Sequence, residues 1–194
     1  GVAATTTAAN QEMSTTSVPG SSQRYAFGRN WRSFLDRLDQ RRIDEARRSL
    51  SELLGANDLA GKCCLDIGSG SGLFSLAANQ LGATVVSFDF DEDSVACTRF
   101  LRDRHARGNN RWEILQGSVL DRQFMAGLGT FDLVYSWGVL HHTGDMATAI
   151  TLAAERVHGD GKLVLAIYND QGFRSRFWHV VKRFYCRGRL PRIV

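Results

Sequence analysis

The chain of 194 residues has few cysteines and no long apolar run, and each scarcity excludes a class of protein. Its four cysteines form neither a disulfide framework nor a metal-ligand pattern, because Cys63 and Cys64 are adjacent and the other two stand alone. No apolar run approaches the roughly 20 residues that cross a bilayer. The N-terminus lacks the basic-then-apolar layout of a secretory signal. We therefore expect a reducing, cytoplasmic setting and no membrane span.

Acidic residues are missing from the C-terminal end. The net charge is +4, and the seven Lys and Arg that follow Asp170 contribute +7, so the first 170 residues carry −3. A mildly acidic domain is thus followed by a basic arm. The arm is explained by a solvated helix face or interdomain surface, or by contact with an anionic partner such as nucleic acid, phosphate or a membrane surface. A hydrophobic content of 43% suffices for one domain with a core.

Composition divides the chain into four segments. Residues 1–23, rich in Thr, Ser, Ala and Gly, are expected to form a flexible tail. Residues 24–60 begin with an aromatic cluster and continue into a helix, which predicts either a lid over a pocket or an aromatic staple that anchors the helix on the core. Residues 61–170 form the expected core, and residues 171–194 a basic helix and arm.

Within residues 61–170, short apolar stretches alternate with helical stretches of about 10 to 15 residues, as in βαβ units. We expect an α/β fold with a Rossmann-like, doubly wound, mostly parallel sheet. Strands are predicted at residues 63–67, 84–88, 112–115, 131–136 and 162–168. Helices are predicted at residues 73–81, 92–107, 145–157 and 173–185, besides one that ends at Gly55.

The most informative stretch is LDIGSGSG at residues 65–72, where glycines alternate between a strand and a helix. Such a turn lets a ligand lie against bare backbone at the carboxyl edge of the sheet. Asp89 ends the next strand, 17 residues after Gly72. A carboxylate at that position accepts hydrogen bonds from both hydroxyls of a ribose. A nucleoside-containing ligand is therefore expected.

An acidic residue two positions before the first glycine of the turn narrows the choice of nucleoside. Asp66 opposes a pyrophosphate, which prefers a helix N-terminus with no anion nearby. S-adenosylmethionine has a ribose, an ammonium and a sulfonium but no phosphate, and it fits the turn better. The other interpretation of Asp66 is a carboxylate that caps the glycine turn itself.

Five segments resemble, in order, the successive motifs of class I S-adenosylmethionine-dependent methyltransferases. They are LDIGSGSG (65–72), VVSFDFDEDSV (85–95), ILQGSVLD (114–121), FDLVYSWGVLHH (131–142) and GKLVLAIYND (161–170). The resemblance covers about residues 61–170 and implies S-adenosylmethionine as cofactor and S-adenosylhomocysteine as product. The cofactor-binding residues that it implies are Asp66, Gly68, Ser69, Gly70, Gly72, Asp89, Phe90, Ser118, Val119, Ser136, Trp137 and Gly138.

The resemblance also assigns roles to these residues. It places residues 66–72 along the methionine portion, Asp89 on the ribose and Phe90 beside the adenine. Ser118 and Val119 meet the adenine edge, and residues 136–139 form the floor near the methyl group.

The sequence departs from the family pattern twice. Where the family often has an acidic residue for the adenine amino group, this chain has Ser118, with Asp121 three residues later. The family sheet usually ends in an antiparallel hairpin of two further strands. The resemblance therefore implies either part of a longer chain or a minimal version that ends with the helix after Tyr168.

Candidate catalytic residues follow the fourth and fifth predicted strands. His141 and His142 can take a proton near neutral pH, or they cap the strand end by bonding to backbone. Tyr168 lies in a polar cluster that is explained by acceptor contact or by a turn that satisfies its own backbone. The spacing of the histidines predicts no metal site.

Missing motifs indicate the acceptor. No Asn/Asp-Pro-Pro-Tyr/Phe tetrapeptide follows the fourth strand, the only prolines are Pro19 and Pro191, and no dedicated nucleic-acid module is visible. By elimination we expect methylation of an oxygen or nitrogen on a small-molecule or sugar-like acceptor. The alternatives are a methyltransferase-like, non-catalytic module whose basic arm binds RNA or protein, and an NAD(P)-dependent oxidoreductase, against which Asp66 argues. The oligomeric state is not predicted.

Overall fold

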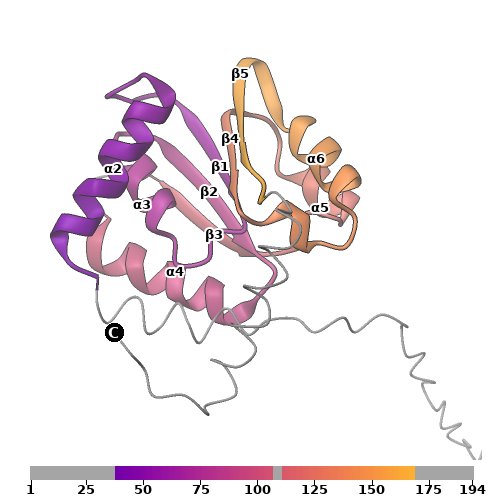
Figure 1. Ribbon diagram of the computed structural model, residues 1–194, viewed down its shortest axis with the longest axis horizontal. Coiled ribbons are helices and arrows are strands. Elements are labelled where there is room, and N and C mark those ends of the chain that lie inside the picture. Colours follow the sequence, from indigo (N-terminus) through magenta and orange to yellow (C-terminus); the bar gives the residue numbers. More distant parts are fainter. Residues whose placement is uncertain (1–37, 107–110, 169–194) are drawn as a thin grey trace, which may run out of the picture.

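Five strands form one sheet in the computed structural model of the chain, which describes residues 38–106 and 111–168 (Figure 1). The strands are β1 (Cys63–Ile67), β2 (Thr84–Asp89), β3 (Trp112–Gln116), β4 (Phe131–Trp137) and β5 (Val157–Ala166). They lie in the order β3-β2-β1-β4-β5, and all four neighbouring pairs are parallel. The predicted Rossmann-like sheet is confirmed, and the described residues contain no antiparallel hairpin.

The order of the strands locates a binding edge. The chain winds from β1 through β2 to β3, and then returns to place β4 on the other side of β1. This reversal makes a topological switch point between β1 and β4. Ligands of open α/β sheets bind outside the carboxyl ends of the strands at such a point. Here those ends are Ile67 and Trp137.

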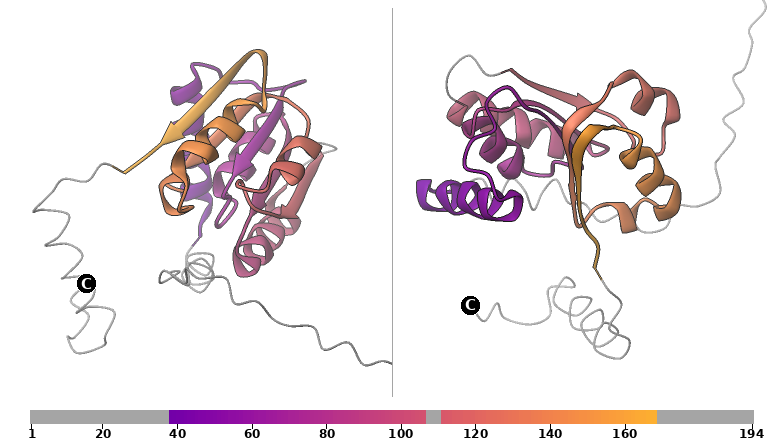
Figure 2. Two further views of the ribbon diagram at one scale, coloured as in Figure 1. Left: turned by 90° about the vertical axis from the view of Figure 1, so that its right-hand side faces the viewer. Right: turned by 90° about the horizontal axis from the view of Figure 1, so that it is seen from above.

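Helices cover both faces of the sheet. On one face lie α2 (Gln40–Leu54), α3 (Leu73–Gln80) and α4 (Glu92–His105), and on the other α5 (Arg122–Gly127) and α6 (Met146–Ala154) (Figures 1 and 2). Alternate strand residues point to opposite faces, so each strand feeds two cores. On β1, Cys64 packs with the α2–α4 layer, whereas Leu65 and Ile67 pack with the α5–α6 layer.

Aspartates are the N-cap residues of four of these five helices. The carboxylates of Asp39, Asp91, Asp121 and Asp145 each accept a backbone N–H from the first turn of the helix that follows. Helix α3 begins instead at Gly72, with no side-chain cap. The N-terminus of α3 therefore keeps uncapped N–H groups at the switch point.

Several element boundaries differ from the prediction. Strand β5 runs over Val157–Ala166 instead of residues 162–168, with a register irregularity between Phe131 and Leu133, and Tyr168 lies beyond its end. The short helix α5 was not predicted, and α4 ends at His105. The predicted tail, the aromatic part of the lid segment, and the C-terminal helix and arm lie outside the described residues.

Candidate cofactor and acceptor site

The glycine turn between β1 and α3 is tied to the end of β2. The backbone N–H groups of Gly68 and Ser69 both donate to the carbonyl oxygen of Phe88, at 2.8 and 3.1 Å. Gly68, Gly70 and Gly72 all have positive φ, from 55° to 81°, which side chains disfavour. Glycine is therefore required at these three positions, because the backbone of the turn adopts positive φ there.

Protein atoms also crowd two of these glycines. A Cβ on Gly68 would lie 2.5 Å from Cγ1 of Val139, and one on Gly72 would lie 2.8 Å from Cγ2 of Thr98. The hydroxyl of Thr98 also lies 3.1 Å from that of Ser69 and donates to the carbonyl of Gly70. At these two positions the missing side chains make room for neighbouring protein segments, which the sequence pattern did not reveal.

Asp89 joins the end of β2 to the glycine turn. Its Oδ2 accepts the N–H of Gly70 at 2.9 Å, and its Oδ1 accepts the N–H of Asp91 at 3.0 Å. Burial raises the pKa of this carboxyl, and these N–H bonds oppose that rise. Each carboxylate oxygen retains further acceptor capacity, which is the chemistry that ribose hydroxyls require.

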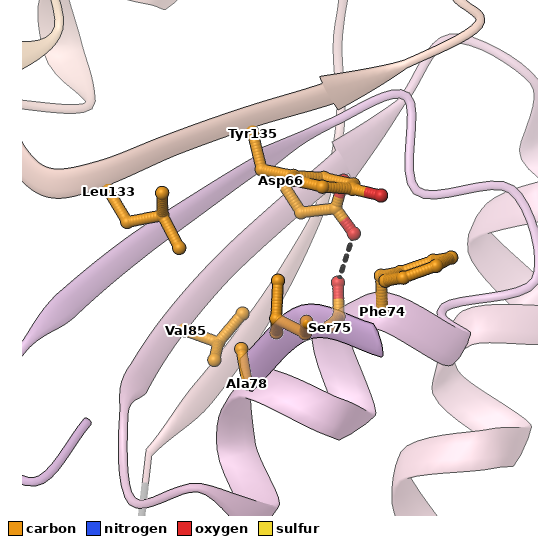
Figure 3. Close-up of a pocket in the computed structure, with 8 residues that line it drawn as sticks. Asp66, Phe74, Ser75, Ala78, Val85, Leu133 and Tyr135 are labelled. Carbon is orange, nitrogen blue, oxygen red and sulfur yellow. Dashed lines mark hydrogen bonds between the residues drawn. The ribbon is translucent and has the colours of Figure 1, made fainter. Parts of the chain in front are cut away.

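Asp66 lies deeper than the sequence indicated. It is 6% exposed, and its Oδ2 accepts a hydrogen bond from the hydroxyl of Ser75 in α3 at 2.6 Å (Figure 3). Burial raises its pKa to about 7, the Ser75 bond opposes that rise, and the charge of Asp89 adds to it. Asp66 therefore exchanges its proton near neutral pH, which weakens the assumption of a permanently charged carboxylate at the turn.

A small cavity of about 10 Å³ lies beside Asp66, with room for one water molecule at most (Figure 3). It is lined by Leu50, Asp66, Phe74, Ser75, Ala78, Val85, Leu133 and Tyr135. The hydroxyl of Tyr135 is buried without a hydrogen-bond partner. Ser75 and Tyr135 were not predicted as site residues. Their meeting with Asp66 depends on the packing of α3 and on strand register, which one sequence does not show.

Three near-parallel rings run along this face of the sheet to the carboxyl end of β4. Phe74 stacks on Tyr135 at 5.3 Å and on Trp137 at 6.4 Å, and the latter two rings are 6.0 Å apart. Trp137 is 49% exposed. Ser136, which stands between Tyr135 and Trp137 in the chain, is buried. Its hydroxyl donates to the carbonyl of Ile67 at 3.0 Å and so links β4 to β1.

The three predicted catalytic residues are brought together beyond β4 and β5. The 3-10 helix η1 (Leu140–His142) places the ring centroids of His141 and His142 3.9 Å apart, and the Tyr168 ring lies edge-on 4.9 Å from His141. A Cβ on Gly138 would lie 2.8 Å from the Tyr168 hydroxyl, so glycine at 138 lets that hydroxyl approach the backbone. Burial lowers the pKa of His141.

The residues predicted beside the adenine differ in exposure. Phe90 is 56% exposed, whereas the side chain of Val119 is buried in the α5–α6 core. The hydroxyl of Ser118 accepts the N–H of Leu120 at 3.2 Å. The carboxylate of Asp121 accepts two N–H groups at the start of α5, so its role is a helix cap.

The described residues hold neither a metal-binding cluster nor a membrane-spanning helix. Within residues 38–106 and 111–168, no three His, Cys, Asp or Glu side chains are grouped to hold a metal ion. No helix in the same ranges has the length and apolar character that a bilayer crossing demands.

A parallel sheet with a glycine turn and an acidic residue at the end of β2 defines a nucleoside-binding α/β protein. Residues 38–185 match the family described as "Methyltransferase domain", and the chain belongs to this family, the class I S-adenosylmethionine-dependent methyltransferases. The resemblance stated from the sequence is confirmed.

Relatives in sequence agree with this membership, and a solved structure has a similar fold. The chain is 32% identical over 110 residues to the mitochondrial ubiquinone biosynthesis O-methyltransferase of Schizosaccharomyces pombe (57% of this chain, 39% of that protein). It is 30% identical over 114 residues to the ubiquinone biosynthesis O-methyltransferase of Rhizobium rhizogenes (59% and 44%). The chain thus spans less than half the length of these relatives. The fold is similar to magnesium protoporphyrin IX methyltransferase of Synechocystis with bound S-adenosylmethionine (TM-score 0.55, 20% identity, 79% of this chain and 68% of that chain).

Proposed function

We propose that this chain binds S-adenosylmethionine and transfers its methyl group to an oxygen or nitrogen of a small-molecule acceptor by in-line displacement. The observation that carries the proposal is the Asp89 carboxylate, which ends β2 and accepts the N–H of Gly70 in the glycine turn. This bond brings a carboxylate that can accept from ribose hydroxyls next to the glycine turn at the carboxyl edge of the sheet. The family of the chain supports the same cofactor.

The proposed cofactor site follows the family motifs residue by residue. Residues 66–72 line the methionine portion, Asp89 holds the ribose, and Phe90, Ser118 and the backbone at Val119 border the adenine. Ser136, Trp137 and Gly138 form the floor beside the methyl group. When bound, S-adenosylmethionine supplies a methyl group on a sulfonium, and S-adenosylhomocysteine is the product.

The acceptor side is proposed at the carboxyl ends of β4 and β5. There His141, His142 and Tyr168 lie together, and the exposed ring of Trp137 stands at the end of β4. Alignment of the reacting atoms supplies most of the acceleration in such a displacement, and a general base adds about 10²- to 10⁴-fold where the nucleophile carries a proton. The histidines are the residues of this cluster suited to that task near neutral pH.

An oxygen nucleophile is favoured over nitrogen, because the two relatives quoted above are named O-methyltransferases. Their partial coverage keeps the acceptor itself a proposal. We propose no nucleic-acid acceptor and no role for a membrane. A cytoplasmic location remains a prediction from cysteine usage.

Calorimetric titration of the chain with S-adenosylmethionine, S-adenosylhomocysteine and NADH tests the proposal. We expect heat from the first two ligands and none from NADH. Asp89→Asn should weaken binding at least tenfold, because an amide replaces an acceptor-only carboxylate at the ribose. The matched control is Asp103→Asn on the exposed face of α4, where Asp103 pairs only with Arg102 among the described residues. Folded protein that gives no heat with either S-adenosylmethionine or S-adenosylhomocysteine contradicts the proposed function.

A further inference from the structure

The two histidines of η1 lie ring against ring but differ in their access to water. Their ring centroids are 3.9 Å apart and the rings are tilted by 46°. Both ring nitrogens of His141 are buried and have no hydrogen-bond partner. His142 is exposed. The pair therefore consists of one imidazole whose nitrogens are buried and one on a residue exposed to water.

Protonation of the shielded ring is unfavourable. A protonated imidazole has two N–H donors, and both would be buried without an acceptor in His141. Burial accordingly lowers the pKa of His141. With His141 neutral, a proton on His142 faces an uncharged ring instead of a like charge at short range.

We infer that His142 accepts the proton of the acceptor group during methyl transfer, and that His141 is a positioning residue whose neutral ring holds His142 at the mouth of the site. This inference rests on the proposed function. It separates two residues that the sequence alone treats as equivalent candidates.

The groups packed around the pair leave this division intact. Tyr168 presents the edge of its ring to His141. Helix α6, which packs on η1, is capped by Asp145, whose carboxylate accepts the N–H of Thr148 at 3.0 Å. Hydrogen bonds from Thr148 lower the pKa of Asp145, and the charge of Arg122 in α5 lowers it further. Burial is the one cause of the His141 shift among the described residues, so no carboxylate there favours its charged form.

The acceptor oxygen or nitrogen forms a bond to the methyl carbon as the carbon–sulfur bond breaks, and the sulfonium becomes a neutral thioether. The bond between the acceptor atom and its hydrogen also breaks, and that electron pair stays on the acceptor atom. The proton goes to a ring nitrogen of His142, which becomes an imidazolium and later releases it to solvent.

Nuclear magnetic resonance of the full chain with ¹³C-labelled histidine tests the charge assignment without cofactor or acceptor. The chain has five histidines, and single His→Gln variants assign their ring signals. As the pH is lowered, the His141 signal should leave its neutral position only below the usual pKa of histidine, because burial lowers the pKa of His141. Under this inference, the His142 signal should move first. A His141 signal that moves in place of that of His142 overturns the inference.

Kinetics test the roles, with labelled S-adenosylmethionine and catechol as the probe acceptor. His142→Gln should lose 100-fold or more in kcat and lose the rise of rate with pH. His141→Phe keeps a planar ring against His142, so it should lose less than about tenfold and keep the pH dependence. A loss as large in His141→Phe as in His142→Gln overturns the inference. Heat with S-adenosylmethionine in both variants separates that result from failure of the proposed function.

Discussion

Asp66 and Tyr135 are Cα partners on the neighbouring strands β1 and β4, and their side chains line the same small cavity beneath α3 (Figure 3). The carboxylate of Asp66 accepts a hydrogen bond from Ser75, but the hydroxyl of Tyr135 has no hydrogen-bond partner. Burial raises the pKa of Tyr135, so its hydroxyl remains neutral. One satisfied and one unsatisfied polar group therefore share the space behind the glycine turn.

Replacing Tyr135 by Phe should stabilise the protein by about 1 kcal/mol, because it removes a buried hydroxyl that makes no hydrogen bond. The ring stack with Phe74 and Trp137 is kept. Urea unfolding followed by tryptophan fluorescence measures the change. A loss of stability would instead indicate a water molecule that bridges the hydroxyl to Asp66 in the cavity.

Asp66→Asn should stabilise the protein at pH 8 and have little effect near pH 4. The folded-state pKa of Asp66, about 7, lies above its unfolded value of 3.8, so folding takes up a proton between these pH values. The contribution of Asp66 to stability is thus fully present below about pH 4 and is lost as pH rises through about 7. The loss is at most about 4 kcal/mol. An amide oxygen can still accept from Ser75.

Urea unfolding of the unchanged protein and of Asp66→Asn at pH 5 and pH 8 measures how the stability depends on pH. The gain from Asp66→Asn should be larger at pH 8. Asp103→Asn on exposed α4 is the matched control and should show no such difference. Equal gains for Asp66→Asn at both pH values would mean that the carboxyl of Asp66 keeps an ordinary pKa.

Lys162→Met should loosen the C-terminal end of α2. The Lys162 ammonium donates to the carbonyl of Leu54 at 3.0 Å and so fastens α2 to β5 across 108 residues of sequence. Loss of this charged bond should cost about 1 to 2 kcal/mol. Amide hydrogen exchange at Gly55 and Ala56 should quicken. Lys62→Met is the control: the Lys62–Asp132 pair is exposed to water, so its loss should lower the stability less than loss of the Lys162 bond does.

The parts of the fold that follow from local pattern were predictable, and those that depend on pairing were not. Strand β1 is a short, mostly apolar run between Lys62 and Gly68, and its bounds were predicted correctly. Strand β5 starts earlier than predicted, at Val157, which pairs with Phe131 of β4. The sequence did not indicate this start, because the next residues, His158–Gly161, are polar or glycine and lie at the register irregularity. The partnership of Asp66 with Ser75 depends on how α3 packs over β1.

The candidate site shows the same division. The glycine turn, Asp89 and the His141–His142 pair were predicted from motifs that stand close together in sequence. Asp121, which the sequence left as a candidate near the adenine, instead caps α5. This helix was not predicted, because it is only six residues long and shows no clear hydrophobic period. The difference in exposure between the two histidines arises from tertiary packing, which their adjacency in sequence conceals.

Gly68→Ala should destabilise the protein by about 2 kcal/mol and weaken binding of S-adenosylmethionine. The added Cβ would lie 2.5 Å from Cγ1 of Val139, and the φ of 77° disfavours any side chain. Val139 directly precedes η1, so the displaced chain should also disturb His141 and His142. Adding Val139→Ala removes both crowding methyl carbons and should restore about half of the lost stability, since the backbone strain remains. Urea unfolding and calorimetry of both single variants and the double variant measure this coupling. Purely additive effects would mean that the turn and the η1 loop do not contact each other as described.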